Sequence, residues 1–284
     1  MTPRVAVIIP HYDDLERLAR CLAALLPGPV PEGVEVVVVD NGSPGDVAAV
    51  VGAFPGVRLV VEPEKGAAPA RNRGVAETTA PHLAFLDADC VPAPEWLSAV
   101  QMVELLEVIG GAIGVFDETE GPRTGAQAFE TVFAFNQARY IAEEGFTVTA
   151  NMLTTREIFT HVGGFRTGVS EDRDWCARAR AAGYDVRYHR ALSVAHPTRG
   201  DWPALRRKWL RLTEESFPLS RSRVAWGLRA VAVLGSPLRD VLRIWGSGGL
   251  RGMGERWRAT TTLFRLRGLR ARWMVHQALG REIS

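Results

Sequence analysis

The sequence predicts an α/β fold in which a mostly parallel sheet is flanked by helices and followed by an amphipathic helical extension. Two observations lead to this fold class. In the first two thirds of the 284 residues, short apolar runs rich in β-branched residues alternate with segments of helical period, which is typical of parallel strands joined by crossover helices. Beyond about residue 200, only the helical period continues.

Four apolar runs are expected to form the first strands: Val5–Ile9, Val34–Val39, Val57–Val61 and His82–Leu86. Their nearly continuous apolar character indicates that helices cover both faces of the sheet. The connecting segments fit helices at Asp14–Leu26, Asp46–Gly52 and Ala67–Glu77. In the last of these we expect Asn72 and Arg73 to be exposed.

After Asp89 the pattern is less regular. We predict helices at Glu95–Glu107, Gly125–Tyr140 and Glu171–Ala182, and strands at Gly110–Phe116, Phe146–Ala150 and Asp185–Tyr188. From Asp201 onward the chain is helical and amphipathic, with a kink expected at Pro237. We therefore divide the chain into an α/β domain, residues 1–200, with halves at about 1–90 and 91–200, and a basic helical tail, residues 201–284.

Composition narrows the class of protein. Hydrophobic residues make up 46% and charged residues 23% of the chain, which excludes wholesale disorder. Cys21, Cys90 and Cys176 have no C-x-x-C spacing, so we expect neither a disulfide framework nor a thiolate zinc site. The apolar run Val5–Pro10 is too short for a secretion signal, and a cytoplasmic protein is expected.

The net charge of +2 conceals a strong asymmetry. Residues 1–196 carry a net charge of −10 and residues 197–284 a net charge of +12. A basic tail that also contains six tryptophans has the composition of a surface that binds an anionic membrane. A solvated helical face, packing on the rest of the chain and an oligomer contact are the alternatives. Arginines interrupt the apolar runs, so we expect the tail to lie on a membrane rather than cross it.

Carboxylates follow three of the predicted strands, in Pro10–Asp14, Asp40–Ser43 and Asp87–Asp89. Ligands of parallel α/β sheets bind beyond the carboxyl ends of the strands, and a bound cation or ligand hydroxyls would relieve the repulsion between the carboxylates. Strand alternation would place Asp87 and Asp89 on the same side, one against a sugar or ribose hydroxyl and the other against a divalent ion. Hard oxygen ligands favour magnesium or manganese.

In their order along the chain, these motifs resemble those of the family 2 glycosyltransferases. The matching segments are Val5–Asp13, Val36–Ser43, Lys65-Gly66, Ala70–Gly74, Leu83–Asp89, Ala150–Met152, Gly163–Phe165 and Glu171–Trp175. The resemblance covers about residues 4–196 and implies a GT-A (Rossmann-like) fold and inverting transfer of a sugar from a nucleotide-sugar donor. It also implies that residues up to about 90 bind the nucleotide and that residues from about 91 to 200 receive the acceptor.

The same resemblance implies roles for five residues on the donor side. Asp40 would hold the base, usually uracil, and Pro10 and Tyr12 would line the same pocket. Arg71 would approach the nucleotide or the sugar. Asp87 would face the ribose or the donor sugar. The expected donor is therefore a UDP-sugar.

For the metal, the resemblance implies that Asp89 and His196 bind Mn²⁺ or Mg²⁺, which bridges the diphosphate. Asn41 stands where relatives often have a second aspartate, which would alter contacts with the base or the ribose.

Inverting transfer requires a group that takes the proton of the acceptor hydroxyl. Asp172 matches the aspartate of the family's Glu-Asp motif at the start of a predicted helix, where the helix dipole would favour its ionised form. Capping of that helix by Ser170, Glu171 and Asp172 is the alternative. Trp175 is expected either to pack in the core or to form part of the acceptor platform.

Polymer synthases of this family carry a Gln-x-x-Arg-Trp motif, and the nearest string, Leu205–Trp209, lacks its Gln and its Arg. We therefore expect non-processive transfer of one sugar to a hydroxyl of a glycan or a lipid-linked acceptor, in polysaccharide or glycolipid biosynthesis. The alternative is a catalytically inactive scaffold that binds a nucleotide-sugar or docks on membranes. No glycine-rich phosphate loop follows the first strand, which argues against a nucleotidyltransferase or a dinucleotide-dependent enzyme. No nucleic-acid partner is expected.

Overall fold

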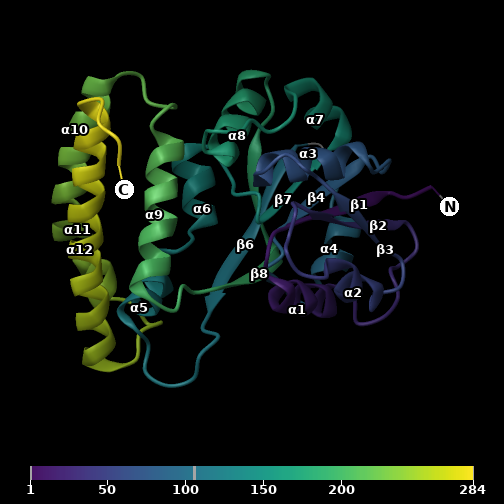
Figure 1. The fold of residues 1–284 in the computed structure, drawn as a ribbon, viewed down its shortest axis with the longest axis horizontal. Helices are drawn as coiled ribbons and strands as arrows, with labels where there is room; N and C mark the ends of the chain where they lie inside the picture. The colour runs from purple at the N-terminus through teal and green to yellow at the C-terminus, as the bar shows by residue number, and fades with distance from the viewer. Residues whose placement is uncertain (1, 105–106, 284) are drawn as a thin grey trace. The chain divides into compact units, whose positions relative to one another are not determined.

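The computed structural model describes residues 2–104 and 107–283 and divides the chain into two compact units (Figure 1). The first unit comprises residues up to 114 together with residues 136–167 and 171–196. The second unit comprises residues 115–135, 168–170 and 197 to the C-terminal end. Each unit has an apolar core of its own.

Among the described residues, eight strands form one sheet in the order β3-β2-β1-β4-β7-β6-β8-β5. The strands are β1 (Val5–His11), β2 (Val34–Asp40), β3 (Val57–Val61), β4 (His82–Leu86), β5 (Val91–Pro92), β6 (Val108–Phe116), β7 (Asn151–Thr155) and β8 (Val186–Pro197). Strands β1 to β4 pair in parallel, whereas β7 pairs antiparallel with β4 and β6, and β5 pairs antiparallel with β8. The predicted α/β class is confirmed, and its parallel part is the series of four strands at the start of the chain.

The helices of the first unit are α1 (Leu15–Leu25), α2 (Val47–Gly52), α3 (Ala67–Ala76), α4 (Trp96–Met102), α6 (Gln137–Arg139), the short π-helical turn η1 (Tyr140–Glu144), α7 (Arg156–Val162) and α8 (Glu171–Ala181). The predicted helices at α1, α2, α3 and α8 are confirmed. Asp14 and Asp46 cap α1 and α2 by accepting backbone N–H groups three residues ahead, which satisfies donors that the helix itself leaves free.

Side chains of β1 alternate between the two faces of the sheet and define two apolar cores. Val7 and Ile9 pack with residues of α1, α2 and α4, whereas Ala6 and Ile8 pack with residues of α3, α7 and α8 (Figure 1). Helix α3 lies so close to β1 that a Cβ on Gly74 would be 2.4 Å from Ile8 Cγ2. This close approach holds α3 over the carboxyl ends of β1 and β2.

The predicted strand Phe146–Ala150 is wrong, because the strand that follows, β7, begins only at Asn151. Side chains take two of the backbone donors of this segment. The N–H of Val148 donates to Oε1 of Gln137 at 3.4 Å, and the N–H of Thr149 donates to Oδ1 of Asp172 at 3.2 Å.

Other predicted elements differ in length, among them the strand Gly110–Phe116, which begins at Val108 in β6. Helix α4 ends at Met102, and residues 105 and 106 of the predicted helix lie outside the described part of the chain. The predicted helix Gly125–Tyr140 is interrupted, because a new helix starts where Asn136 accepts the N–H of Arg139. The predicted strand at Asp185–Tyr188 is the beginning of β8, which continues to Pro197.

From Trp202 onward the described chain forms helices, as expected, but the second unit, which holds them, also includes residues 115–135, which we assigned to the α/β domain. Its helices are α5 (Gly125–Phe133), α9 (Trp202–Ser216), α10 (Arg223–Gly235), α11 (Pro237–Trp245) and α12 (Gly252–Ala278). Pro237 occupies the first turn of α11 and separates it from α10, which suits a residue without a backbone donor. Phe129, Leu205 and Leu263 belong to the apolar core of the second unit. No helix among the described residues combines the length and the apolar character that a membrane span needs.

Candidate functional site

The loop after β2 is held by Asp40. Its Oδ1 accepts the Ser43 hydroxyl at 2.5 Å and the Ser43 N–H at 3.1 Å, and His11 Nδ1 lies 3.7 Å away. Gly42 has φ 77°, a backbone conformation that glycine adopts without strain. Asp40 is therefore fixed beside the end of β1, where Pro10 and Tyr12 lie.

Asn41 fastens the neighbouring loop between β3 and α3. Its Nδ2 donates to the carbonyls of Glu62 and Glu64 at 2.9 and 2.6 Å, and its Oδ1 accepts the N–H of Gly66 at 2.7 Å. Only an amide both donates and accepts in this way. The structure thus gives Asn41 a role in holding the protein backbone, and its expected effect on base or ribose contacts stays a prediction.

Lys65 belongs to the loop that Asn41 holds. Its Nζ donates to the carbonyls of Asn41 and Gly42 at 2.8 and 3.1 Å and lies 4.5 Å from the ring centroid of Tyr12. The Tyr12 side chain is 57% exposed, whereas Pro10 is partly buried. An ammonium group and an exposed aromatic ring thus stand side by side at the edge of the first unit.

Arg71 of α3 connects two carboxylates. It is buried, with Nη2 2.5 Å from Oδ1 of Asp87 and with Nη1 paired to Glu171. Burial opposes its charge, but Glu171 and Asp87 outweigh burial and hold the pKa of Arg71 above its usual range. We expected Arg71 to approach the nucleotide or the sugar; the structure commits its Nη atoms to protein carboxylates, which it positions.

Asp87 and Asp89 lie in a turn, so the prediction that strand alternation places them on the same side is wrong. Strand β4 ends at Leu86, and the N–H of Cys90 donates to the carbonyl of Asp87 at 3.0 Å. Asp87 meets Arg71, whereas Oδ2 of Asp89 lies 3.1 Å from Nε2 of His196. The antiparallel pairing of β5 with β8 brings these last two residues together.

Asp172 stands in the first turn of α8 with Oδ1 3.2 Å from the N–H of Thr149. Burial raises its pKa to about 7, and Glu171 adds to the rise, whereas Arg71 and the Thr149 hydrogen bond act in the opposite direction. The helix dipole, which was expected to favour the ionised form, is thus opposed by burial and by Glu171. Such a carboxyl can take up or release a proton near neutral pH.

The two carboxylates that were considered as caps of α8 have other partners: Glu171 pairs with Arg71, and Asp172 accepts the N–H of Thr149. Trp175 is fully buried, stacks on Phe159 and donates from Nε1 to the carbonyl of Gly163 at 2.8 Å. Its predicted part in an acceptor platform is therefore wrong, and the alternative of core packing holds.

The residues that were expected to bind a metal supply two neighbouring ligand groups. No set of three or more His, Cys, Asp or Glu residues in the described part of the chain is arranged to hold a metal ion. Asp89 and His196 offer one carboxylate and one imidazole within 3.1 Å. A carboxylate and an imidazole so close together are two groups that can ligate Mn²⁺ or Mg²⁺.

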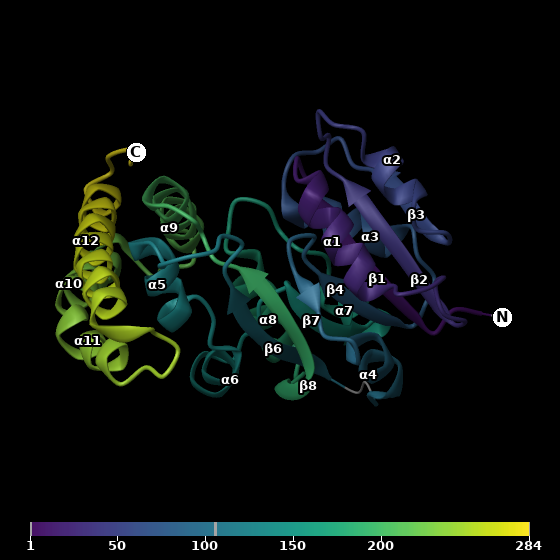
Figure 2. The same ribbon diagram turned by 90° about the horizontal axis from the view of Figure 1, so that it is seen from below.

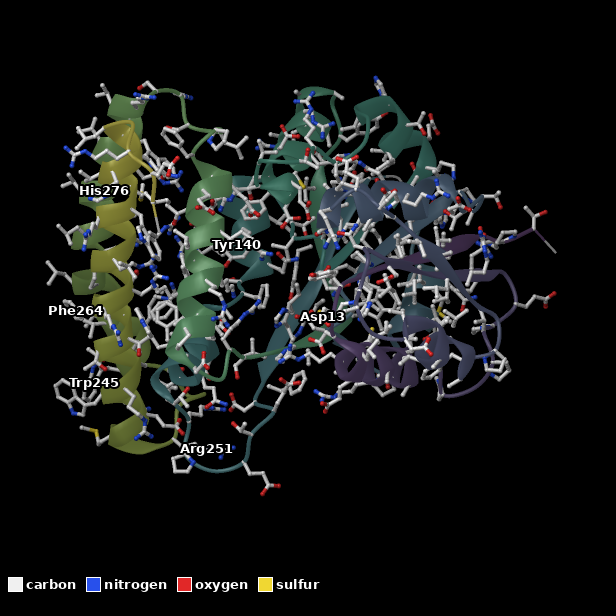
Figure 3. All side chains as sticks on the ribbon, viewed as in Figure 1. Asp13, Tyr140, Trp245, Arg251, Phe264 and His276 are labelled. Atoms are coloured by element: carbon white, nitrogen blue, oxygen red, sulfur yellow. The ribbon has the colours of Figure 1, made fainter. Side chains whose placement is uncertain are left out.

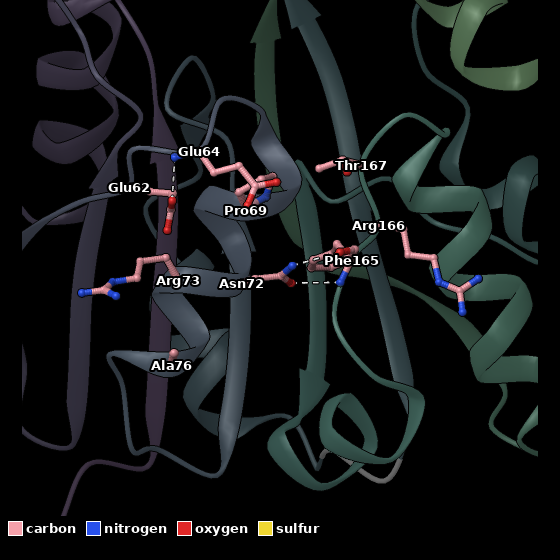
Figure 4. Close-up of a pocket in the computed structure, with 9 residues that line it drawn as sticks. All are labelled: Glu62, Glu64, Pro69, Asn72, Arg73, Ala76, Phe165, Arg166 and Thr167. Atoms are coloured by element: carbon pink, nitrogen blue, oxygen red, sulfur yellow. Dashed lines mark hydrogen bonds between the residues drawn. The ribbon is translucent and has the colours of Figure 1, made fainter.

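Sequence reasoning missed a clamp between α3 and the turn after α7. The side chain of Asn72 is partly buried, not exposed as expected; its Oδ1 accepts the N–H of Phe165 and its Nδ2 donates to the Phe165 carbonyl, both at 2.9 Å. The motifs at Ala70–Gly74 and Gly163–Phe165 were the available signal. The clamp borders a cavity of about 510 Å³, shown in Figure 4 and lined by Glu62, Glu64, Pro69, Asn72, Arg73, Ala76, Phe165, Arg166 and Thr167.

Comparisons with known proteins agree with this architecture. Residues 6–167 match the family described as glycosyl transferase family 2. The chain is 29% identical over 208 residues to glycosyltransferase AglE of Haloferax volcanii, covering 69% of this chain and 68% of the relative. It is 30% identical over 215 residues to the pre-mycofactocin glycosyltransferase of Mycobacterium tuberculosis, covering 70% of this chain and 44% of that relative.

Among solved structures, the fold resembles that of the mannosyltransferase PcManGT from Pyrobaculum calidifontis, solved in complex with GDP-Man and Mn²⁺. The TM-score is 0.55 at 16% identity, with 100% of this chain and 77% of the other covered. The class of protein is thus a GT-A glycosyltransferase. The chain belongs to glycosyltransferase family 2, as its motifs predicted.

Proposed function

We propose that the protein transfers a single sugar, with inversion, from a nucleotide-sugar to a hydroxyl of a glycan or a lipid-linked acceptor. One observation carries this proposal: Arg71 joins Asp87 to Glu171, the neighbour of Asp172. The carboxylate expected at the donor and the carboxylate expected at the acceptor thereby belong to one continuous network.

On the donor side, we assign the base to Asp40 and the surrounding pocket to Pro10 and Tyr12. The Ser43 bonds orient the Asp40 carboxylate, which can still accept from an N–H of a base. Uracil offers such a donor, in line with a UDP-sugar. The GDP-Man bound by PcManGT makes guanine the competitor that an experiment must include.

For the metal, Asp89 and His196 would hold Mn²⁺ or Mg²⁺. When bound, the ion would offset negative charge on the departing diphosphate. Asp87 precedes Asp89 in the same turn, and its Oδ1 lies 2.5 Å from Nη2 of Arg71. We assign to Asp87 the orientation of a sugar or ribose hydroxyl.

Asp172 would act as the base. The acceptor oxygen forms a bond to C1 of the sugar while the bond between C1 and the diphosphate oxygen breaks, and the hydroxyl proton passes to the carboxylate of Asp172. The nucleoside diphosphate leaves with the electron pair of the broken bond, and C1 is inverted. A pKa of about 7 suits this role, because a base is most effective when its pKa lies near the working pH.

The two parts of the chain are given different roles. We assign catalysis to residues 1–200, with nucleotide binding in about 1–90 and acceptor binding in about 91–200. The basic tail, residues 201–284, would bind an anionic membrane surface. The enzyme would then act on the cytoplasmic face of the membrane. Such a location suits a lipid-linked acceptor.

The experiment is a thermal-shift series with UDP, GDP, CDP and CMP, each with Mn²⁺ and with EDTA, because a ligand that binds only the native state raises the unfolding midpoint. We expect stabilisation by UDP with Mn²⁺ and its loss with EDTA. Asp172→Asn should keep this shift but lose sugar transfer, measured as release of the nucleoside diphosphate. Wild-type turnover by Asp172→Asn would exclude the base assignment, and no shift with any nucleotide would favour an inactive scaffold.

A further inference from the structure

The exposed apolar side chains of the second unit form two apolar stripes along α10, α11 and α12. On α10 and α11 they recur three or four residues apart, at Val224, Leu228, Val231, Leu234, Leu238 and Leu242. A second stripe follows α12, at Met253, Trp257, Phe264 and Val275, with Leu279 just after the helix. Every one of these side chains is at least 42% exposed.

The opposite faces of the same helices are packed inside the second unit. Trp226 and Ala230 of α10 contact Met274 of α12, and Nε1 of Trp226 donates to Oε1 of Gln277 at 2.9 Å. Figures 1 and 2 both show α10 and α11 running beside α12, and Figure 3 labels Phe264 on this layer. The helices are thus fixed by one face, and the apolar stripes remain on the solvent side.

The charges on these helices are one-sided. Residues 223–278 are all described, and their carboxylates, Asp240 and Glu255, are both buried at 3% exposure. Asp240 pairs with Arg239 and Arg267 at 3.4 Å each, and Glu255 pairs with Arg123 at 3.3 Å. The exposed charged side chains of the three helices are all arginines: Arg223, Arg229, Arg239, Arg243, Arg258, Arg265 and Arg272.

Together these features select the partner. A series of exposed leucine and valine side chains is unfavourable in water and marks an interaction surface. Nucleic acid would satisfy the arginines, and Trp257 and Phe264 could stack on its bases. The stripe of α10 and α11, however, is entirely aliphatic and offers the bases neither hydrogen bonds nor aromatic stacking. An anionic lipid surface satisfies both, because acyl chains cover the apolar side chains and lipid phosphates pair with the arginines.

We propose that the layer formed by α10, α11 and α12 docks on an anionic lipid membrane. The apolar stripes enter the boundary between headgroups and acyl chains, and the flanking arginines contact lipid phosphates. This refines the membrane role proposed for residues 201–284 by assigning it to α10–α12. The docking does not depend on the transfer reaction, although it would bring the enzyme to a lipid-linked acceptor.

Flotation of the full chain with vesicles tests the proposal. Vesicles of phosphatidylcholine alone are compared with vesicles that also contain phosphatidylglycerol. We expect binding to the anionic vesicles, weaker binding at high salt, and little binding to the neutral ones. Leu228→Glu combined with Leu238→Glu should lower the apparent affinity at least about tenfold, because each leucine loses apolar burial and adds repulsion.

The matched control is Met102→Glu, an equally drastic change at a side chain of the first unit that is 84% exposed; it should leave flotation unchanged. The nucleotide-induced thermal shift should be the same in all variants, which shows that they are folded. Wild-type flotation by the leucine variant, or no flotation of the wild type, would overturn the proposal. The proposal would also be overturned if the leucine variant lost self-association or oligonucleotide binding while its binding to vesicles was unchanged. That result would identify the occupant of the surface as a second copy of the chain or as a nucleic acid. Loss of sugar transfer with intact flotation would count only against the proposed function.

Discussion

Nη2 of Arg71 lies 2.5 Å from Oδ1 of Asp87, and the same guanidinium pairs with Glu171. Arg71 is therefore the cation that lets three acidic side chains, Asp87, Glu171 and Asp172, lie near one another. It also lowers the pKa of Asp172, against burial and Glu171, which raise it.

Replacing Arg71 by Met should therefore destabilise the protein by about 3 kcal/mol, because carboxylates in a partly buried site lose their partner. The acid limb of the pH profile of sugar transfer should also move to higher pH, since the pKa of Asp172 rises further. Arg71→Lys should fall between, because an ammonium group lacks the guanidinium fork. Urea unfolding and initial rates against pH measure the two effects. Arg73→Met, an exposed neighbour on the same helix, is the control and should change stability by less than about 0.5 kcal/mol.

The raised pKa of Asp172 also predicts how stability depends on pH. The pKa is about 7 in the folded chain and about 3.9 in an unfolded chain. Folding therefore favours the protonated carboxyl; this contribution is fully present below about pH 4 and is lost as the pH rises through about 7.

Asp172→Asn, which cannot ionise, should be as stable as the wild type near pH 4 and more stable at pH 8, by on the order of 2 kcal/mol after solvent screening. Unfolding midpoints of both proteins measured across this range check the sign. Asp185→Asn, which removes an exposed carboxylate of the same unit, is the control against which the pH dependence of the Asp172→Asn difference is compared. A variant that is less stable than the wild type at pH 8 would contradict the raised pKa.

The Asp89–His196 pair makes a prediction about metal removal. Asp89→Ala and His196→Ala should each abolish the UDP-induced thermal shift that depends on Mn²⁺, as EDTA does for the wild type. At saturating ligand the loss is about 3 kcal/mol, or several degrees in the midpoint for a chain of this size. The double variant should be no worse than either single one, because the two residues act through one ion. Glu95→Ala, an exposed carboxylate in the same unit, should behave as the wild type.

Asn41→Asp tests whether this position is structural. The change removes two donated hydrogen bonds and turns a carboxylate toward the carbonyls of Glu62 and Glu64. We expect a loss of about 2 kcal/mol in the free energy of unfolding, whether or not nucleotide is present. Asp46→Asn is the matched control, because asparagine caps a helix as well as aspartate does. Unchanged stability with weaker nucleotide binding would instead restore a role in the donor pocket.

The sequence predicted those parts of the fold that depend on local pattern. The strands at Val57–Val61 and His82–Leu86 appear with the predicted bounds, because an apolar run between polar turns admits few other structures. The segment Phe146–Ala150 alternates apolar residues with threonine, as a strand can, but it is a loop in which Gln137 and Asp172 take two of the backbone donors. Those partners belong to other elements of the chain, and no periodicity in the segment reveals them.

The site shows the same division. The family resemblance selected Asp89 and His196, which are far apart in the sequence. In the structure Oδ2 of Asp89 lies 3.1 Å from Nε2 of His196. The pairing of Arg71 with Glu171 could not be predicted, because an ion pair between two helices distant in the sequence leaves no pattern in either. Trp175 was ambiguous for a different reason: a tryptophan next to an acidic motif fits a core as well as a surface, and only burial decides.

The pairing of Val91 with Ala195 has a consequence for the order in which the protein is made. Strands β1 to β4 lie in one continuous stretch at the start of the chain and can assemble while synthesis is still under way. His196 reaches Asp89 only after β8 has left the ribosome and paired with the two residues of β5. Under the proposed roles, a nascent chain would complete the β1–β4 part of the sheet before Asp89 and His196 could share a metal, and sugar transfer would wait until the last strand is in place.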